Sequence, residues 1–493
     1  MVGRAIHKVL VANRGEIALR VIRACRTRGI ATVAVYSDAD RSAPHVCAAD
    51  EARRIGPAPA SESYLRIPAM VETARETGAD AVHPGYGFLA ENPAFASACA
   101  DAGLVFIGPT AETLARCGDK AEARRAIRAA GIPVLPGTDP VDDEEAAAAA
   151  ARIRFPVLIK AAGGGGGKGI HRVSRAEDLP GALRLARGEA RAAFGDDRVY
   201  LERWVDDPRH VEMQIAADAH GAVVHLGERE CSIQRRHQKL LEEAPSLALD
   251  GRLRRAMGAA AAEAARAVGY RNVGTVEFLV DGPRFYFLEI NARLQVEHPV
   301  TELVTGIDLV GLQLEIASGA PLPLRQEDIV FRGHAIECRV SAEDPAAQFL
   351  PSAGRVGEVI LPGGPGVRVD AALVSGIEVT RHYDPLLAKI IAWGETREET
   401  IARMAAALSE MVVTGVPTTI PFHRWALRHP AFAAGRYSTR FTDLEWARRA
   451  PIDPALAAVA AVVLAHRDGR RPPTLPVQEA PGWKAAARRE ALS

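Results

Sequence analysis

Two glutamates placed within apolar strand sequence constrain this chain more than any other feature. The segment GTVEFLV around Glu277 has the β-branched and aromatic residues of a strand, residues 281–283 are turn formers, and RFYFLEI, which contains Glu289, reads as a returning strand. The sequence therefore predicts a β-hairpin. A loop centred near residues 282 and 283 sets the two glutamates roughly opposite each other, and directly opposed residues have Cβ atoms about 4.5–5.5 Å apart.

Two carboxylates at that spacing repel each other and need protons, basic partners or a cation, because apolar neighbours remove water from them. A divalent cation would satisfy both. Asn291 lies two residues after Glu289, on the same side of the strand, and adds a neutral oxygen ligand. Oxygen-only ligand sets suit Mg²⁺ or Mn²⁺. The alternative is an ordinary hairpin whose glutamates lie on a solvated face.

The whole chain has 493 residues, which is too long for one hydrophobic core and indicates about three domains. Lys plus Arg and Asp plus Glu both number 61, so no net charge favours nucleic acid or an anionic membrane. The six cysteines contain no C-x-x-C pair, which predicts reduced thiols without disulfides or a zinc site. The longest apolar run, residues 455–465, is shorter than a membrane helix, and no signal-type apolar segment follows the first basic residues. We expect a cytoplasmic protein.

Strand and helix patterns alternate over residues 1 to about 110, which predicts a βαβ layout with a parallel sheet. The first β-to-α turn, residues 12–16, holds one glycine where a dinucleotide-binding fingerprint needs three, so an NAD site is not favoured. Tyr86 follows a strand within HPGYGF and is placed to face the crevice where open α/β sheets bind ligands. A packed aromatic in an ordinary turn is the alternative.

Five glycines, residues 163–167, follow the strand-like FPVLIKAA and precede Lys168 and the strand-like IHRV. Glycines let backbone N–H groups approach an anion closely, and Lys160 and Lys168 add positive charge. This strand–loop–strand unit is therefore predicted to be a flap over phosphates. It is not a P-loop, because Ala162 and Gly169 stand where that motif needs Gly and Ser or Thr. A flexible linker is the alternative.

Three polar segments come next. The pattern VYLERWV, residues 199–205, predicts a strand whose last four residues form an edge for a purine. HVEMQIAAD alternates and places His210, Glu212 and Gln214 on one face. The polar run 234–239 with the glutamates after it is typical of a pocket wall, and a solvated charged face is the alternative.

Helices are predicted over residues 251–269 and 303–318, and a strand over 334–340. That strand places Arg339 on the face opposite its apolar residues, where a surface salt bridge is the alternative to a functional role. The last 47 residues are rich in Ala, Arg and Pro and are expected to form a peripheral helix and a disordered end.

Taken in order, these features resemble the ATP-grasp enzymes, and specifically the biotin carboxylase family. The resemblance extends to about residue 446 and depends on VANRGEIALR, HPGYGFLAEN, FIGP, IKAAGGGGGKG, PRHVEMQ, ERECSIQRRHQKLLEEAP, GTVEFL, EINARLQVEHPVTE and HAIECR. It implies a mixed α/β and α+β fold. A Rossmann-like N-terminal domain would span 1–112, and an ATP-grasp domain would span 113–330 with a mobile glycine-loop lid over about 132–204. A C-terminal biotin carboxylase domain would span 331–446, followed by the tail 447–493.

The resemblance also implies a role for each matching residue. ATP phosphates or ribose would be bound by Lys120, Lys160, Gly165, Gly166, Gly167, His210 and His237, and adenine would be lined by Glu202, Arg203, Trp204 and Val205. Two Mg²⁺ or Mn²⁺ ions, and through them ATP, would be held by Glu277, Glu289 and Asn291. Bicarbonate would be bound by Lys239, Arg293, Gln295 and Val296, with Glu297 as its general base. The biotin ureido group would meet Arg339 and Tyr86.

These residue types suit the implied reaction, in which bicarbonate attacks the γ-phosphate of ATP and the carboxyphosphate formed releases CO₂ beside biotin. Both reactants are anions, so cations must neutralise the oxygens while Arg293 and Lys239 hold the nucleophile in line. Glu297 can then remove the bicarbonate proton. Phosphate would take the ureido proton, Arg339 would stabilise the enolate, and the glycine flap would exclude water.

The sequence contains no Met-Lys-Met biotin acceptor, so we expect biotin to be a substrate on a separate biotin carboxyl carrier protein, with carboxyltransferase subunits as further partners. The resemblance implies a homodimer and the first half-reaction of an acetyl-CoA or related acyl-CoA carboxylase. The alternatives are the corresponding subunit of a pyruvate carboxylase and a carbamoyl-phosphate-type ligase, although the ligase gives no reason for Arg339 and Tyr86 to face a ureido ring. A noncatalytic binding module is not favoured, because Glu289, Arg293 and Glu297 are all present.

Overall fold

The computed structural model describes residues 5–163, 169–448, 459 and 462. The chain divides into two compact units, Met1–Asp443 and Leu444–Ser493, and the fold below is that of the first unit. Gly165, Gly166, Gly167 and Lys168 lie outside the described residues, as does nearly all of the predicted tail 447–493.

A five-stranded parallel sheet forms the N-terminal part, with strand order β3-β2-β1-β4-β5. Its strands are β1 (Lys8–Val11), β2 (Ala31–Ser37), β3 (Glu51–Gly56), β4 (Ala81–His83) and β5 (Val105–Phe106). The helices are α1 (Gly15–Arg26), α2 (Pro44–Ala48), α3 (Ile67–Glu76), α4 (Pro93–Asp101) and α5 (Ala111–Gly118). The alternating pattern of the sequence therefore predicts this sheet correctly.

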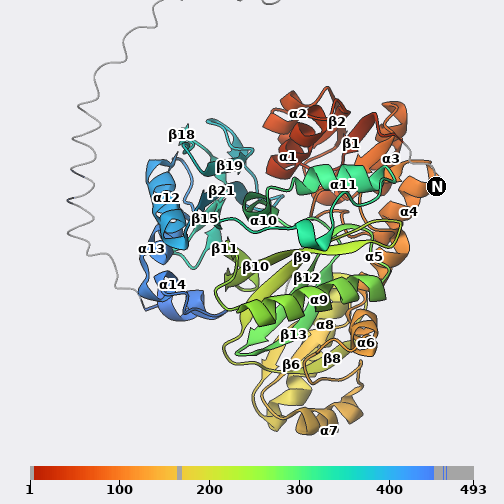
Figure 1. Cartoon of the computed structure of the whole chain (residues 1–493), viewed down its shortest axis with the longest axis vertical. Coiled ribbons are helices and arrows are strands. Elements are labelled where there is room, and N and C mark those ends of the chain that lie inside the picture. Colours follow the sequence, from red (N-terminus) through yellow and green to blue (C-terminus); the bar gives the residue numbers. More distant parts are fainter. Residues whose placement is uncertain (1–4, 164–168, 449–458, 460–461, 463–493) are drawn as a thin grey trace, which may run out of the picture. The chain divides into compact units, whose positions relative to one another are not determined.

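An eight-stranded antiparallel sheet, ordered β13-β12-β9-β10-β11-β14-β21-β19, occupies the centre of the unit (Figure 1). Its strands are β9 (Arg209–Ala217), β10 (Val223–Arg235), β11 (Gln238–Ala244), β12 (Asn272–Asp281), β13 (Arg284–Asn291), β14 (His334–Ser341), β19 (Val367–Ala371) and β21 (Leu386–Gly394). Helix α9 (Gly251–Ala267) packs on this sheet, because Leu253, Met257, Ala261 and Ala264 form one buried helical face.

A separate three-stranded antiparallel sheet carries the glycine loop. Its order is β7-β6-β8, with β6 (Val157–Ala161), β7 (His171–Val173) and β8 (Val199–Arg203). Helices α7 (Asp143–Ile153) and α8 (Leu179–Phe194) pack beside it, and α6 (Lys120–Ala129) precedes it. The predicted strand–loop–strand order is confirmed, because β6 and β7 pair directly on either side of the loop.

Two predicted elements differ from the structure. The strand predicted over 199–205 ends at Arg203, which pairs with Val157 of β6. The next residue on the partner strand is Pro156, which has no N–H to continue the ladder. Trp204 and Val205 therefore lie in a loop. The helix predicted over 303–318 is two helices, α10 (His298–Thr305) and α11 (Leu309–Ala317). The first ends because Gly306 adopts a left-handed conformation.

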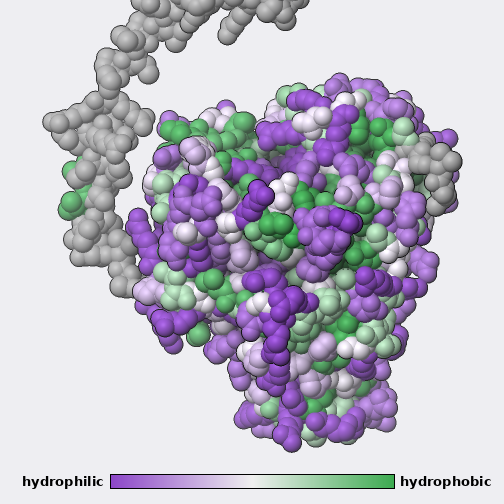
Figure 2. All heavy atoms as spheres, in the orientation of Figure 1, coloured by the Kyte–Doolittle hydropathy of each residue, from purple (hydrophilic) through white to green (hydrophobic). Residues whose placement is uncertain are grey.

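The C-terminal part adds helices α12 (Arg397–Glu410), α13 (Ile420–Arg428) and α14 (Pro430–Ala433) to β14, β19 and β21. Three short strand pairs complete it: β15 (Glu343–Asp344) with β16 (Leu350–Pro351), β17 (Gly354–Arg355) with β20 (Glu378–Val379), and β18 (Val359–Ile360) with β22 (Val412–Val413). Figure 2 shows hydrophilic residues over most of the visible face of the described chain, with hydrophobic residues in small groups between them. None of the described helices is both long and apolar enough to cross a membrane.

Candidate active site

The predicted hairpin is present, and Glu277 of β12 is paired with Glu289 of β13. The strands join through a two-residue turn between Asp281 and Arg284, in which the glycine has a positive φ of 57°. Asn291 is paired with Thr275, two positions along from the glutamates. The turn alone would place Leu288 opposite Glu277, but a β-bulge in β13 adds one residue and brings Glu289 to that position. Local sequence therefore predicts the hairpin and the approximate pairing of the glutamates, but not the bulge.

In this structure both glutamates have basic partners. Glu277 accepts a hydrogen bond from Lys239 Nζ at 2.8 Å, and its other oxygen lies 2.9 Å from His210 Nε2. Glu289 lies 2.7 Å from Lys120 Nζ. Burial alone would raise the pKa of Glu277, but Lys239 and His210 outweigh it and hold that pKa well below its ordinary value. Both carboxylates are thus placed among positive charges.

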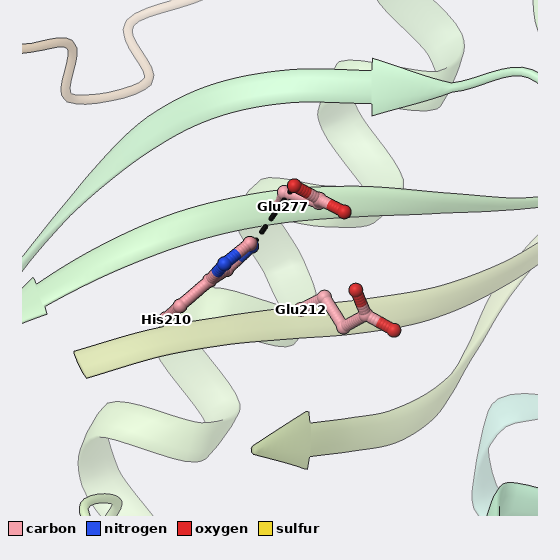
Figure 3. Close-up of side chains that lie close together, drawn as sticks. All are labelled: His210, Glu212 and Glu277. Atoms are coloured by element: carbon pink, nitrogen blue, oxygen red, sulfur yellow. Dashed lines mark hydrogen bonds and ion pairs between the residues drawn. The ribbon is translucent and has the colours of Figure 1, made fainter. Parts of the chain in front are cut away.

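Figure 3 shows His210 and Glu277 pointing toward each other from neighbouring strands, with Glu212 beside them. His210 and Glu212 lie on β9, and Glu277 is paired with Glu212 across β9 and β12. One ligand atom from each of these three residues lies within 4.8 Å of the others. This buried cluster shares Glu277 with the predicted metal set, whereas Glu289 and Asn291 are not in it.

Lys239 is the centre of the charged cluster. Its ammonium donates to Glu212 at 2.5 Å, to Glu297 at 2.6 Å and to Glu277 at 2.8 Å. Burial would lower the pKa of Lys239, but these three carboxylates outweigh that effect and raise it well above its ordinary value. Lys239 therefore stays protonated and links the hairpin to the loop that follows β13.

Glu212 has a second cationic partner in Arg229, whose side chain is completely buried. Its guanidinium donates to Glu212 and Gln214 at 2.5 Å each, and to Thr275 and Thr301 at 3.0 Å each. Glu212 is therefore held between two cations. The sequence places His210, Glu212 and Gln214 on one face correctly, but it gives no indication that Arg229 of the next strand faces them.

Glu297 lies between Lys239 and Arg339 and is fully buried. Arg339 Nη2 is 2.8 Å from Glu297 Oε2, and Arg339 Nε donates to Glu242 at 2.6 Å. Burial would raise the pKa of Glu297, but the two cations hold it well below its ordinary value, so the carboxylate is ionised. Arg339 does not form the surface salt bridge considered above, since its carboxylate partners are buried. Burial raises the pKa of Glu242 to about 7.

The loop after β13 presents further polar groups. Arg293 Nε donates to Glu91 at 2.8 Å, and the same carboxylate accepts from the backbone of Ala292 at 3.0 Å. The buried amide nitrogen of Gln295 has no hydrogen-bond partner among the described residues. Val296 O accepts from Lys389 Nζ at 2.8 Å. Because a buried donor without an acceptor is costly, the free amide of Gln295 indicates a site for an anion or another acceptor.

Other predicted nucleotide residues lie on the three-stranded sheet or in the loop that follows β8. Lys160 Nζ is 2.5 Å from Glu202, so the Glu202 carboxylate is directed at a lysine predicted to bind phosphate. The Arg203 side chain donates to Ile153 O at 3.2 Å, and Trp204 stacks against Arg172 at 4.9 Å.

Two further predicted positions are His237 and Tyr86. His237 is exposed in the tight turn between β10 and β11, and partial burial together with the nearby Lys160 and His210 lowers its pKa, so it lies close to the predicted phosphate-binding residues. Tyr86 donates its hydroxyl proton to Glu16, and its ring lies 5.9 Å from Lys389 Nζ. Lys389 is paired with Arg339 across β14 and β21, so the structure brings Tyr86 near the strand that carries Arg339.

Several residues in and around this cluster are not predicted from the sequence: Glu16, Glu91, Arg229 and Lys389. For all of them except Glu91, which lies in a turn before α4, the signal in the sequence is a charged residue within a strand or helix pattern of apolar neighbours. That signal marks a residue as unusual, but it does not reveal which distant residue pairs with it.

Comparisons with known proteins agree over most of the chain. Residues 5–114 match the family model "Biotin carboxylase, N-terminal domain", residues 119–325 match "Carbamoyl-phosphate synthase L chain, ATP binding domain", and residues 337–443 match "Biotin carboxylase C-terminal domain". Biotin carboxylase 1 of Bacillus subtilis is 52% identical over 442 residues, which cover 89% of this chain and 98% of that protein. A pyruvate carboxylase subunit from Methanothermobacter thermautotrophicus is 51% identical, with 88% and 89% covered.

A solved structure of the biotin carboxylase domain dimer of Hydrogenobacter thermophilus 2-oxoglutarate carboxylase, with MgADP, ADP and bicarbonate, superposes with a TM-score of 0.87. It is 46% identical, and the match covers 89% of this chain and 98% of that one. The motifs, the hairpin register and these matches agree. The chain belongs to the biotin carboxylase family of ATP-grasp enzymes.

Proposed function

We propose that the protein uses ATP to activate bicarbonate and carboxylates biotin that is attached to a separate carrier protein. The observation that carries this proposal is the position of Glu297, an ionised carboxylate fixed between Lys239 and Arg339 at the end of the Glu277–Glu289 hairpin. Glu297 is a base that lies between the carboxylate pair of the hairpin and the half-buried Arg339. This position suits proton removal from bicarbonate next to a nucleotide.

The residues of the hairpin fit divalent ions, because two opposed carboxylates and a nearby amide offer only oxygen ligands. Glu277, Glu289 and Asn291 would hold the Mg²⁺ or Mn²⁺ ions that, when bound, neutralise charge on the ATP phosphate oxygens. Lys120 and Lys160 would bind the phosphates themselves. Each of them now pairs with one glutamate, so a nucleotide would replace these pairs with phosphate contacts.

Bicarbonate would occupy the space beside Lys239, Arg293 and the unpartnered amide of Gln295. One of its oxygens attacks the γ-phosphorus, and the bond from that phosphorus to the bridging oxygen of ADP breaks. Glu297 takes the bicarbonate proton, and the products are ADP and carboxyphosphate. Arg293 and Lys239 neutralise the repulsion between the two anions and keep the attacking oxygen in line.

Carboxyphosphate then breaks its bond between carbon and the phosphate oxygen and gives CO₂ and phosphate. The phosphate takes the proton of the biotin ureido nitrogen, and that nitrogen attacks CO₂. Arg339 would stabilise the negative charge that develops on the ureido oxygen, and Tyr86 would border the ring. The distance of 2.8 Å between Glu297 Oε2 and Arg339 Nη2 supports this assignment. Carboxyphosphate, formed beside Glu297, must release CO₂ where the biotin nitrogen beside Arg339 can attack it.

For the partners, we propose a separate biotin carboxyl carrier protein, carboxyltransferase subunits and a homodimer of this chain. A biotin carboxylase domain related to this chain is described as a dimer. We assign the protein to an acetyl-CoA or related acyl-CoA carboxylase. Carboxylation of acetyl-CoA, but not of pyruvate, after addition of the matching carrier and transferase would support this context, and the opposite result would favour a pyruvate carboxylase.

The decisive experiment measures ADP release from ATP in bicarbonate and Mg²⁺, with and without free biotin. We expect turnover that depends on bicarbonate and increases with biotin. A folded protein that binds ADP but shows no stimulation by biotin would contradict the proposal.

A further inference from the structure

Lys389 is a fully buried lysine that the assigned roles leave unexplained. It lies on β21, and its ammonium donates to Val296 O at 2.8 Å and lies 3.2 Å from Glu16 Oε1. Val296 belongs to the loop between β13 and α10, whereas Glu16 lies in the first turn of α1. One side chain from the C-terminal part therefore holds two segments that are far apart in the sequence.

The contact with Glu16 extends to Tyr86. The same Glu16 oxygen accepts the hydroxyl proton of Tyr86, and Lys389 Nζ lies 5.9 Å from the centroid of the tyrosine ring, within the range of a cation–π interaction. The backbone of Tyr86 is fixed separately, because Asn13 Nδ2 donates to its carbonyl at 2.8 Å. Lys389 thus connects the Tyr86 ring to the backbone of Val296.

The surroundings of Lys389 keep it protonated. Burial would lower its pKa, but Glu16, Glu337 and Asp370 outweigh that effect and raise it. An ammonium has three donors, so Lys389 can bind the Val296 carbonyl and Glu16 at the same time. An apolar side chain of similar length would leave the carbonyl without this donor and Glu16 without its nearest positive charge.

We propose that Lys389 is a positioning residue for biotin carboxylation, which sets the distance between Val296 at the bicarbonate end of the site and Tyr86 at the biotin end. This inference rests on the proposed function, because that function assigns the two ends. CO₂ must pass from carboxyphosphate to biotin inside the site, and reactions between bound groups lose rate steeply when their spacing changes by about 1 Å. Lys389 itself would touch neither substrate.

The test compares Lys389→Met with the wild-type chain in ATP turnover assays. We expect kcat to fall roughly tenfold or more because the spacing of the bound groups changes. The KM for bicarbonate and the KM for free biotin should each also rise roughly tenfold, as for a lost hydrogen bond from a charged donor, while the KM for ATP changes by less than about twofold. Lys8→Met is the matched control, since Lys8 pairs with Glu51 in the N-terminal sheet. A folded Lys389→Met protein with wild-type kcat and wild-type KM values for bicarbonate and biotin would overturn the inference.

Two further variants separate positioning from folding. Glu16→Gln keeps the bond from Lys389 to Val296 and loosens Tyr86, so it should raise the KM for biotin more than the KM for bicarbonate. The double variant Glu16→Gln with Lys389→Met removes opposite charges together, so it should recover the melting temperature without recovering either KM. Recovery of both KM values in the double variant would overturn the inference, even if Lys389→Met alone did not fold.

The same assays distinguish this inference from the proposed function. A folded wild-type protein without biotin-stimulated ATP turnover refutes the proposed function and the inference with it. Active wild-type protein with unchanged kcat and KM values in the variants refutes the positioning role alone.

Discussion

The substitution Glu297→Gln tests the proton-transfer step most directly. Gln has the shape of Glu, and the cations around position 297 keep other partners: Lys239 retains Glu212 and Glu277, and Arg339 retains Glu242. The loss of stability should therefore be close to that of one hydrogen bond to a charged group, about 1.5–3 kcal/mol. This is a fraction of the roughly 5–15 kcal/mol that is typical of folded proteins.

The expected effect on catalysis is much larger. Loss of a general base lowers kcat by roughly 10²–10⁴-fold, whereas the predicted nucleotide contacts do not include Glu297. In Glu297→Gln, ATP turnover in the presence of biotin should therefore fall, whereas the affinity for ADP, measured by calorimetry, should not fall with it. The control is Glu228→Gln, because Glu228 is a buried glutamate that pairs with Arg254 of α9. A fall in kcat of less than about tenfold, or an equal loss of ADP affinity, would refute the assigned role.

Three further predictions concern stability and metal dependence. Arg229→Met should lower the free energy of unfolding by about 3–5 kcal/mol in urea titrations, because it removes a buried cation beside Glu212; a loss below about 1 kcal/mol would contradict this. Burial would raise the pKa of Glu243, but hydrogen bonds from His334 and Arg397 hold it at about 2, below its ordinary 4.5, so its stabilising contribution is complete above pH 4.5 and is lost as the pH falls toward 2. Arg397→Met should thus unfold at a higher pH than the wild type when followed by circular dichroism, and an unchanged midpoint would argue against the pair. Chelation of divalent ions should abolish ATP turnover and leave the melting temperature of the nucleotide-free protein unchanged, and turnover that persists would exclude the proposed metal role.

Local sequence predicts the hairpin, although not the β-bulge that places Glu289 instead of Leu288 opposite Glu277, because the turn at 281–283, the apolar alternation and the two glutamates lie within one short segment. The glycine loop and its flanking strands are predictable for the same reason. The end of β8 is not, because it depends on Pro156 of the partner strand, which lies far from Trp204 in the sequence.

The charged cluster illustrates what a sequence pattern leaves undetermined. Alternation assigns His210 and Glu212 to one face of a strand, but it does not identify the neighbouring strand that supplies Lys239 or Arg229. The contacts of Lys389 are even harder to predict from the sequence, because they join β21 to α1 and to the loop after β13. Hydropathy treats such a lysine as a polar exception within an apolar strand, and only the tertiary arrangement reveals the carbonyl that it binds.

The eight-stranded sheet also determines how this protein can be divided. Strand β11 pairs with β14 from Leu241 opposite Cys338 to Ala244 opposite Ala335, so one sheet continues through the predicted boundary near residue 330. Expression of the two halves as separate polypeptides would expose a row of unpaired backbone donors and acceptors on each half. Such fragments should aggregate alone and recover solubility when expressed together. Insertions for labelling belong instead in exposed turns, such as the one at Gly282, where no backbone ladder has to be broken.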